Sequence, residues 1–263
     1  MRRDGRIIEL KAHKAIWSGA HPANTLEGLR ECYDARVARA EIDFLSYGGD
    51  FVVTHDAPRR SEPVPRLADA LAIVREAPRG PTVLMLDAKD GAPWSSETVE
   101  RLAALIAPVR ERVFVGTPAD WNLRRLRTVD PDVALTFDPQ YYLEAKGSDS
   151  PLPGRDGAYG YHDAHPLAFR RTVPTAEYLR ERVAALLQLV PGIREFHVRM
   201  ALFEQMKDDG FDVIAAAHDA GVLVDLWTLD AGTPRWRERL VRALDAGTDV
   251  VTTNTPRELA RAV

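Results

Sequence analysis

The chain has 263 residues, of which 45% are hydrophobic and 28% are charged. This composition excludes a disordered chain, and the length fits one large α/β barrel as well as two smaller domains. The net charge of −4 provides no broad basic field and argues against nucleic acid as a partner.

The N-terminal stretch MRRDGRIIELKAH has neither the apolar run nor the small-residue cleavage site of a secretory signal. No segment approaches the roughly 20 apolar residues that span a bilayer. We therefore expect a cytoplasmic protein without integral membrane association, whose oligomeric state the sequence leaves open. The single cysteine, Cys32, excludes an intramolecular disulfide and a cysteine-cluster zinc site, and we expect it to be buried on a helix.

Short apolar strands and amphipathic helices alternate along the whole chain. Strands are predicted at 6–13, at 40–46 with a continuation at 51–56, and at 82–90, 113–117, 132–138, 194–200, 223–230 and 249–254. Helices are predicted at 25–36, 66–77, 96–113, 120–130, 175–190, 203–221, 235–247 and 256–263. With about eight strand-helix units, the pattern predicts an α/β protein, a single (β/α)8 TIM barrel over residues 1–263.

A doubly wound open sheet is the alternative fold. It predicts a glycine-rich phosphate-binding turn after an early strand, and neither G-x-G-x-x-G nor G-x-x-x-x-G-K-[ST] occurs in the sequence. The barrel makes a different prediction, because active sites on that fold lie at the carboxyl ends of the strands.

Polar side chains stand at those ends of the first three predicted barrel strands, where alternation would otherwise favour apolar residues. Residues two apart on a strand share a face, so the polar groups converge on one mouth if those faces point inward. The residues concerned are His13, Glu41, Asp43, His55, Asp87 and Lys89.

This set of side chains has a consistent chemistry. Three carboxylates form a hard oxygen-ligand site suited to one divalent cation, Mg²⁺ or Ca²⁺. Two histidines suit proton transfer near neutral pH, and a lysine stabilises charge developing on a phosphoryl group. Taken alone, E-x-D pairs often cap helices or face solvent, and lone histidines are often structural. The combination favours phosphodiester cleavage.

The motifs resemble those of the glycerophosphodiester phosphodiesterases, TIM barrels of the PLC-like phosphodiesterase superfamily. AHKAIWSGAHPANTLEGL is similar to their opening His-Arg-Gly, short loop and Pro-Glu-Asn-Thr, and EIDFLSYGGDFVVTHD to their Glu-x-Asp and His-Asp. LMLDAKD resembles their third-strand Glu-x-Lys, while VDLWTLD and VVTTNTPREL resemble their closing Trp-Thr strand and Thr-Asp/Asn-x-Pro end. The matches follow one another in order over nearly the whole chain.

The resemblance implies roles for individual residues. It makes Glu41, Asp43 and Asp87 the ligands of the cation and His13 and His55 the acid-base pair. It also implies that Lys14 and Lys89 contact the phosphate and that Trp227 lines the substrate pocket.

The sequence departs from the family pattern at several positions. Lys14 replaces the usual arginine and loses its bidentate fork, and Ala15 replaces the following glycine. Ala23 replaces a glutamate in the Pro-Glu-Asn-Thr motif, and Asp87 is one methylene shorter than the family's glutamate. The small cap that the family commonly inserts after His-Asp is missing or vestigial, since only APRRSEPVP follows His55 and Asp56 before the next helix.

A long unpatterned loop insertion is expected at about 139–174, rich in Gly, Pro, Tyr and His. Such segments at an active-site face are usually lids or binding loops, although a surface insertion is the alternative. Tyr141, Tyr161 and His162 are its candidates for contact with substrate. His197, at the end of the sixth strand, is a further pocket candidate for which a structural role is also open.

Two more expectations concern the barrel interior and the reaction. Lys11 and Asp225 lie two residues before His13 and Trp227, and we expect them to point inward and interact, because an unpaired buried charge is costly. The favoured reaction is hydrolysis of a small glycerophosphodiester-like substrate to a phosphomonoester and an alcohol. A cyclising phospholipase D-like lyase and a non-catalytic phospho-ligand-binding barrel remain alternatives, the latter because of Lys14, Ala15 and Ala23.

Overall fold

A computed structural model describes residues 1–3, 5–59, 63–143 and 173–262 of the chain. Eight parallel strands form its centre, and each lies within or next to a segment that the sequence predicts as a strand. They are β3 (Glu9–Ala12), β4 (Arg39–Tyr47), β6 (Val83–Ala88), β7 (Val113–Thr117), β8 (Ala134–Phe137), β9 (Glu195–Arg199), β10 (Leu223–Trp227) and β11 (Val250–Thr253).

The strands close into a barrel. Each is hydrogen-bonded to its neighbour in the order β3-β11-β10-β9-β8-β7-β6-β4, and β3 pairs with β4 to complete the ring. The register places Lys11 beside Arg39 and Asp43 beside Asp87. The prediction of a (β/α)8 barrel is therefore confirmed, and the doubly wound open sheet is wrong.

The predicted continuation of the second barrel strand is a hairpin instead. β5 (Asp50–Val52) runs antiparallel to β4, with Leu45 opposite Val52 and Tyr47 opposite Asp50. The reversal occurs at Gly48 and Gly49, whose φ angles of 59° and 80° are easily adopted by glycine. Because β5 runs back along β4, the segment that follows it carries His55 toward the same cavity as the strand ends.

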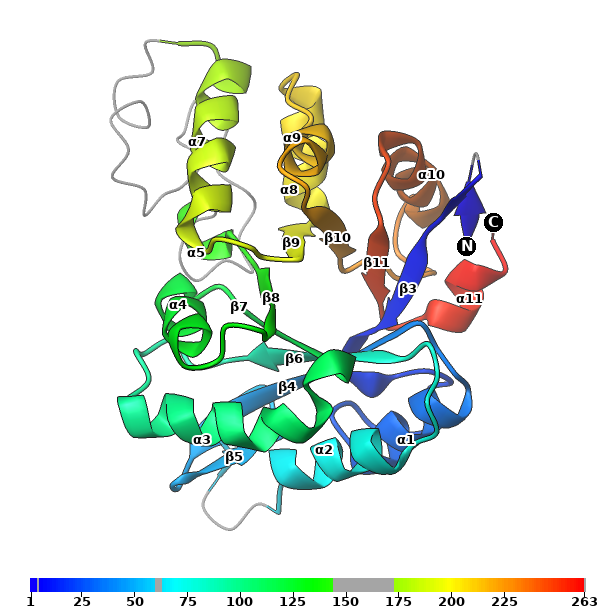
Figure 1. Ribbon diagram of the computed structural model, residues 1–263. Coiled ribbons are helices and arrows are strands. Elements are labelled where there is room, and N and C mark those ends of the chain that lie inside the picture. Colours follow the sequence, from blue (N-terminus) through cyan, green and yellow to red (C-terminus); the bar gives the residue numbers. More distant parts are fainter. Residues whose placement is uncertain (4, 60–62, 144–172, 263) are drawn as a thin grey trace.

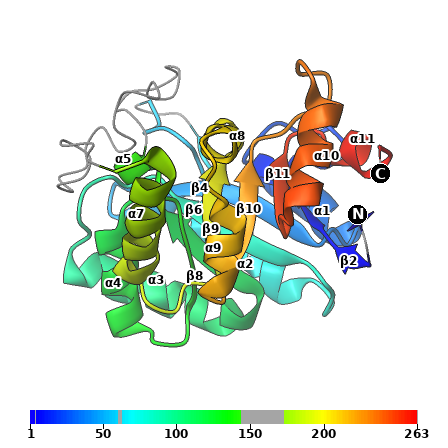
Figure 2. The same ribbon diagram turned by 90° about the horizontal axis from the view of Figure 1, so that it is seen from above.

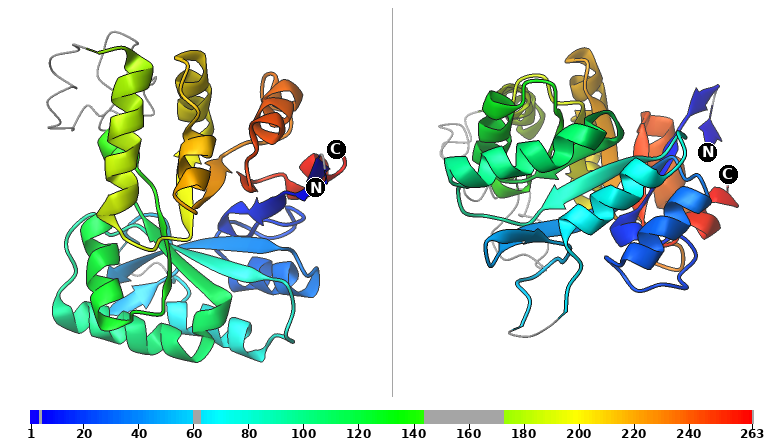
Figure 3. Two further views of the ribbon diagram at one scale, coloured as in Figure 1. Left: turned by 45° about the horizontal axis from the view of Figure 1, so that its top comes forward. Right: turned by 60° about the horizontal axis from the view of Figure 1, so that its bottom comes forward.

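Helices surround the strands (Figures 1 and 2). Two short strands, β1 (Arg2–Arg3) and β2 (Arg6–Ile7), form a hairpin before the barrel, and the two chain termini lie close together (Figure 3). The helices are α1 (Leu26–Asp34), α2 (Leu67–Glu76), α3 (Ser96–Ile106), α4 (Asp120–Val129), α5 (Gln140–Leu143), α7 (Thr175–Leu189), α8 (Met200–Asp208), α9 (Val213–Asp219), α10 (Trp236–Ala246) and α11 (Pro256–Ala260).

Two predicted helices end earlier than their sequence patterns suggest. The segment 203–221 is split because Gly210 adopts a φ of 84° after α8, and Asp212 then caps α9 by accepting from the Ala215 amide. The segment 96–113 is α-helical only to Ile106 and continues as a 3₁₀ turn, η2 (Ala107–Arg112), because Pro108 cannot donate the next helical hydrogen bond.

The core lies between the strands and the helices, with further side chains inside the barrel. Cys32 is fully buried on α1, as expected, and burial raises the pKa of its thiol to about 12. In the barrel interior, Lys11 Nζ donates to Asp225 Oδ2 at 2.6 Å, which confirms the predicted interaction. Among the helices of the described ranges, none is long and apolar enough to cross a membrane.

Candidate active site

A cavity of about 550 Å³ opens at the carboxyl ends of the barrel strands. It is lined by residues from all eight barrel strands or the loops that follow them. The sequence-predicted residues among its lining are His13, Lys14, Glu41, His55, Asp87, Lys89, Tyr141, His197 and Trp227.

Three carboxylates form a cluster at one side of this cavity. Asp43 on β4 lies beside Asp87 on β6, and Glu41 lies two residues before Asp43 on the same inward face. One oxygen from each carboxylate lies within 4.8 Å of the other two. Glu41 and Asp43 are almost completely buried, at 3% and 0% exposure, while Asp87 is partly exposed. Strand alternation thus brings the predicted cation ligands together.

The loop after β3 contributes hydrogen bonds to this cluster. Lys14 and Ala15 have φ angles of 53° and 56°, a strained conformation for residues other than glycine. In this conformation the Lys14 amide donates to Glu41 Oε2 at 2.6 Å. Ala15, which stands where the glycerophosphodiester phosphodiesterase motif has glycine, therefore adopts the left-handed conformation that glycine adopts more easily.

Asn24 and Thr25 of the PANT segment make different contacts, one with the carboxylate cluster and one with helix α1. Asn24 Nδ2 donates to Asp43 Oδ2 at 2.8 Å, and Asn24 Oδ1 accepts from the Asp43 amide at 2.9 Å. Thr25 caps α1 by accepting from the Gly28 amide. The sequence pattern gave Asn24 no role, because its contact with Asp43 depends on the fold of the loop. The motif therefore both orients a carboxylate and begins a helix.

Positive charge near the cluster comes from two lysines. Lys89 Nζ lies 2.5 Å from Asp87 Oδ2 and 2.8 Å from Asp43 Oδ1, and Lys14 Nζ lies 3.6 Å from Asp43 Oδ2. Burial disfavours the Lys89 ammonium, but the neighbouring carboxylates outweigh burial and raise the pKa of Lys89. Lys89 therefore lies within the carboxylate cluster rather than apart from it.

The charge balance of the cluster leaves room for a cation. Three carboxylates face two ammonium groups, and Glu41 Oε1 is buried without a hydrogen-bond partner among the described residues. Burial, followed by repulsion from Asp43 and Asp87, raises the pKa of Glu41 well above its usual value. A buried carboxylate with an unpaired oxygen and too little positive charge nearby fits a divalent ion with oxygen ligands.

A hydrogen bond to Asn254, near the C-terminal end of the chain, fixes the orientation of the His13 ring. His13 Nδ1 lies 2.8 Å from Asn254 Oδ1, and an amide oxygen accepts, so Nδ1 carries the hydrogen. Asn254 is itself fixed by Asp230, which accepts from its backbone amide at 2.6 Å and from Nδ2 at 2.8 Å. Burial lowers the pKa of His13. The neutral ring therefore leaves Nε2 free to accept a proton, 3.9 Å from Glu41 Oε2.

The second predicted histidine is more exposed. The His55 side chain is 49% exposed, and its Nδ1 lies 3.0 Å from Asp56 Oδ1. It shares the cavity with His13 but comes from the segment after β5, whereas His13 directly follows β3. The two histidines therefore reach the cavity from different parts of the barrel rim.

Aromatic side chains form part of the cavity wall. Tyr141 on α5 stacks on Trp121 with ring centroids 6.1 Å apart, and the Trp227 indole Nε1 is buried without a hydrogen-bond partner among the residues that the structure covers. The start of the predicted loop insertion is thus a short helix, α5. Residues 144–172 of that insertion, which include Tyr161 and His162, lie outside the described residues.

His197 does not end its strand but lies in the middle of β9, where it is 6% exposed. Its Nε2 contacts Glu195 Oε2 at 3.2 Å and Lys11 Nζ at 3.4 Å. It lines the floor of the cavity, and its close contacts are with other buried polar groups of the barrel interior.

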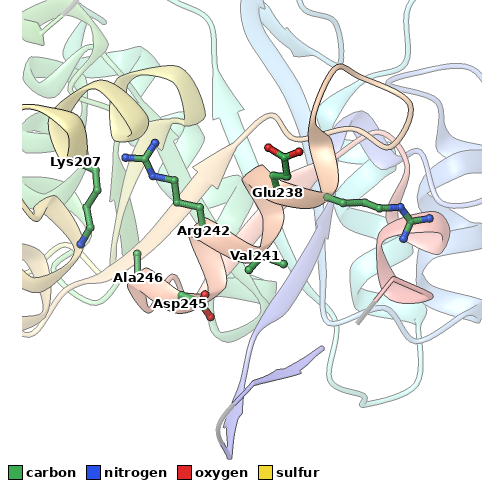
Figure 4. Close-up of a pocket in the computed structure, with 7 residues that line it drawn as sticks. Lys207, Glu238, Val241, Arg242, Asp245 and Ala246 are labelled. Atoms are coloured by element: carbon green, nitrogen blue, oxygen red, sulfur yellow. The ribbon is translucent and has the colours of Figure 1, made fainter.

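A second depression, of about 610 Å³, lies on the outer surface between α8 and α10 (Figure 4). It contains no histidine and no residue from a strand end, and Arg242 and Asp208 form an ion pair across the two helices. Its side chains offer no arrangement for chemistry. They are Lys207, Arg237, Glu238, Val241, Arg242, Asp245 and Ala246.

Comparison with known proteins finds likeness in structure but not in sequence. No protein-family model and no curated protein matches the chain. A glycerophosphodiester phosphodiesterase from Parabacteroides distasonis has a TM-score of 0.68 at 14% identity, covering 97% of this chain and 95% of its own. One from Agrobacterium tumefaciens has a TM-score of 0.59 at 13% identity, covering 95% and 98%.

A phosphodiesterase from Oleispira antarctica, solved in complex with the product sn-glycerol-3-phosphate, has a TM-score of 0.58 at 16% identity. The match covers 97% of this chain and 96% of that one. At these identities the likeness establishes a common architecture over nearly the full length. The chain therefore has the (β/α)8 barrel fold of the glycerophosphodiester phosphodiesterases, the fold that the resemblance of its motifs implied.

Proposed function

We propose that this chain is a metal-dependent phosphodiesterase. It cleaves a small glycerophosphodiester-like substrate to a phosphomonoester and an alcohol. The observation that carries the proposal is one cavity that holds a carboxylate cluster, two histidines from different loops and a lysine at the strand ends. The shared fold with solved glycerophosphodiester phosphodiesterases supports the same reading.

The proposed cation ligands are Glu41, Asp43 and Asp87. Their donor set of carboxylate oxygens favours Mg²⁺ or Ca²⁺ over softer metals. When bound, such an ion would draw electron density from the phosphoryl oxygens and offset their negative charge. Asn24 would keep the Asp43 carboxylate in position, and the Lys14 amide would do the same for Glu41.

His13 is the proposed general base. Its Nδ1 hydrogen is engaged by Asn254, so its free Nε2 accepts the proton of the attacking water. His55 is the proposed general acid, which donates a proton to the alcohol oxygen as the P–O bond breaks. In-line displacement requires the two groups to act on opposite sides of the phosphorus atom. Their separate origins on the barrel rim are compatible with that requirement.

The remaining cavity residues bind the substrate in this proposal. Lys89 and Lys14 supply positive charge to the phosphate, although Lys14 acts as a point charge without the fork of arginine. Trp227 and Tyr141 form walls of the cavity that would hold the alcohol moiety. Tyr161 and His162 of the proposed lid would contact the substrate from the segment that follows α5.

A panel of phosphodiesters assayed with and without chelator tests the proposal. We expect chelator-sensitive release of alcohol from glycerophosphodiesters, with activity restored by adding back Mg²⁺ or Ca²⁺. Phosphorus NMR of the products should show a phosphomonoester. A persistent cyclic phosphate as the sole product would make the enzyme a lyase, and binding of the diesters without turnover would make the chain a ligand-binding barrel.

A further inference from the structure

A second cluster of potential metal ligands lies inside the barrel, below the proposed active site. Glu195 and His197 on β9 and Asp225 on β10 each offer one ligand atom, and these atoms lie within 4.8 Å of one another. All three residues are buried. Two carboxylates and one imidazole are a donor set that divalent transition ions such as Mn²⁺ and Zn²⁺ accept in proteins.

The Lys11 ammonium lies among these three ligand atoms. Lys11 Nζ is 2.6 Å from Asp225 Oδ2, 3.4 Å from His197 Nε2 and 3.6 Å from Glu195 Oε2. Lys11 is 1% exposed, so its charge has no other compensation than its neighbours. Burial disfavours the ammonium, but Asp225 and Glu195 outweigh burial and raise the pKa of Lys11, which therefore stays charged.

The interior cluster differs from the cluster at the mouth in its charge balance. Arg39 Nη2 lies 2.9 Å from Glu195 Oε1, and Arg39 Nε pairs with the partly exposed Glu9, so the cations Lys11 and Arg39 face two buried carboxylates and one partly exposed carboxylate. Thr252 Oγ1 donates to Asp225, at 2.9 Å from Oδ1 and 2.8 Å from Oδ2. At the mouth, three carboxylates face two ammonium groups and Glu41 Oε1 is unpaired. Each buried carboxylate of the interior cluster thus contacts a lysine or arginine, whereas Glu41 at the mouth has neither within ion-pair distance among the described residues.

We infer that Lys11 fills a second cation site with its own ammonium group. The site has the ligands for a divalent transition ion, but the Lys11 ammonium occupies the position that such an ion would take. In consequence, the interior cluster takes up no metal while Lys11 is present, and it becomes a metal site when that side chain is shortened. The inference concerns residues other than the proposed catalytic ligands and stands independently of the reaction assigned above.

The interior cluster borders the cavity of the proposed active site. Lys11, His197, Asp225 and Thr252 all line the cavity that opens at the carboxyl ends of the strands. Shortening Lys11 would therefore join the vacated volume to an existing cavity. An ion that enters there would meet Asp225, Glu195 and His197 in place of the ammonium.

The test measures bound Mn²⁺ per chain in the purified full-length protein after equilibrium dialysis. The variants are Lys11→Ala, which opens the position, and Lys11→Met, which fills it with an apolar side chain of similar length. Each is measured in the wild-type and the Asp43→Asn backgrounds, so that Mn²⁺ at the mouth is counted separately. We expect Lys11→Ala to bind one more Mn²⁺ per chain than the parent in both backgrounds, and Lys11→Met to bind no more than the parent.

Thermal unfolding provides the second readout. Mn²⁺ should raise the melting temperature of Lys11→Ala more than that of Lys11→Met, because the ion replaces the lost charge between the carboxylates. If Lys11→Ala folds only when Mn²⁺ is present, that result also supports the inference. Folded Lys11→Ala with no additional Mn²⁺ would overturn it, as would a variant that stays unfolded at every Mn²⁺ concentration while Lys11→Met folds. Failure of the mouth to bind Mn²⁺ would instead count against the proposed function alone.

Discussion

The buried carboxylate of Glu195 should make a measurable, pH-dependent contribution to stability. Glu195 is fully buried on β9 and faces Lys11, His197 and Arg39. Burial alone would raise its pKa, but attraction to Lys11, the hydrogen bond from His197 and attraction to Arg39 together lower the pKa of Glu195 to about 2. Glu195→Gln keeps the volume and removes this charge.

The sign and size of the effect follow from the pKa. The folded-state pKa lies below the usual value of 4.5, so the stabilisation is fully present above pH 4.5 and is lost as the pH falls toward 2. A difference of 2.5 pKa units, 4.5 − 2, corresponds to about 3 kcal/mol of unfolding free energy at neutral pH. At pH 3 about 1 kcal/mol of it remains.

Urea unfolding of the wild type and Glu195→Gln from pH 7 to pH 3 measures this contribution. The difference in unfolding free energy between the two proteins should shrink by about 2 kcal/mol over that range. Subtracting the variant removes the titration of the other carboxylates that both proteins share. Glu100→Gln, on the exposed side of α3, is the matched control. A wild-type-minus-variant difference that does not change with pH would refute the reasoning.

Three further predictions concern the cavity. Asp43→Asn should abolish chelator-sensitive activity while the circular dichroism spectrum stays unchanged, because the amide keeps the volume but removes charge from the cation ligands; unchanged metal affinity and turnover would contradict the assignment. Asn254→Ala should lower kcat by about ten-fold to a hundred-fold with little change in KM, since a hydrogen bond to the charged His13 ring is worth about 1.5–3 kcal/mol. A rise in KM by a similar factor would instead indicate that Asn254 contacts the substrate. Tyr141→Ala should raise KM and leave the melting temperature nearly unchanged, with Tyr141→Phe as the control that retains stacking on Trp121.

The sequence by itself determined the fold class and the identity of most cavity residues. Alternation along a strand is a local property, so the spacing of Glu41 and Asp43 already placed both carboxylates on one face. The same reasoning placed Lys11 and Asp225 inside the barrel, and their opposite charges required a buried partnership, which the structure contains.

Only the tertiary structure decided which groups meet across the barrel. His13 and Asn254 are 241 residues apart in the chain and are brought into contact by closure between β3 and β11. No local pattern predicts that Lys89 pairs with Asp43, or that Asn24 in a left-handed loop conformation orients the same carboxylate. Alternation is identical in a continuing strand and in a returning one, so only the Gly48-Gly49 pair in the sequence indicates the turn, and the antiparallel pairing of β5 with β4 is seen only in the structure. Periodicity specifies the face of an element, whereas the partners of that face depend on the register and closure of the whole sheet.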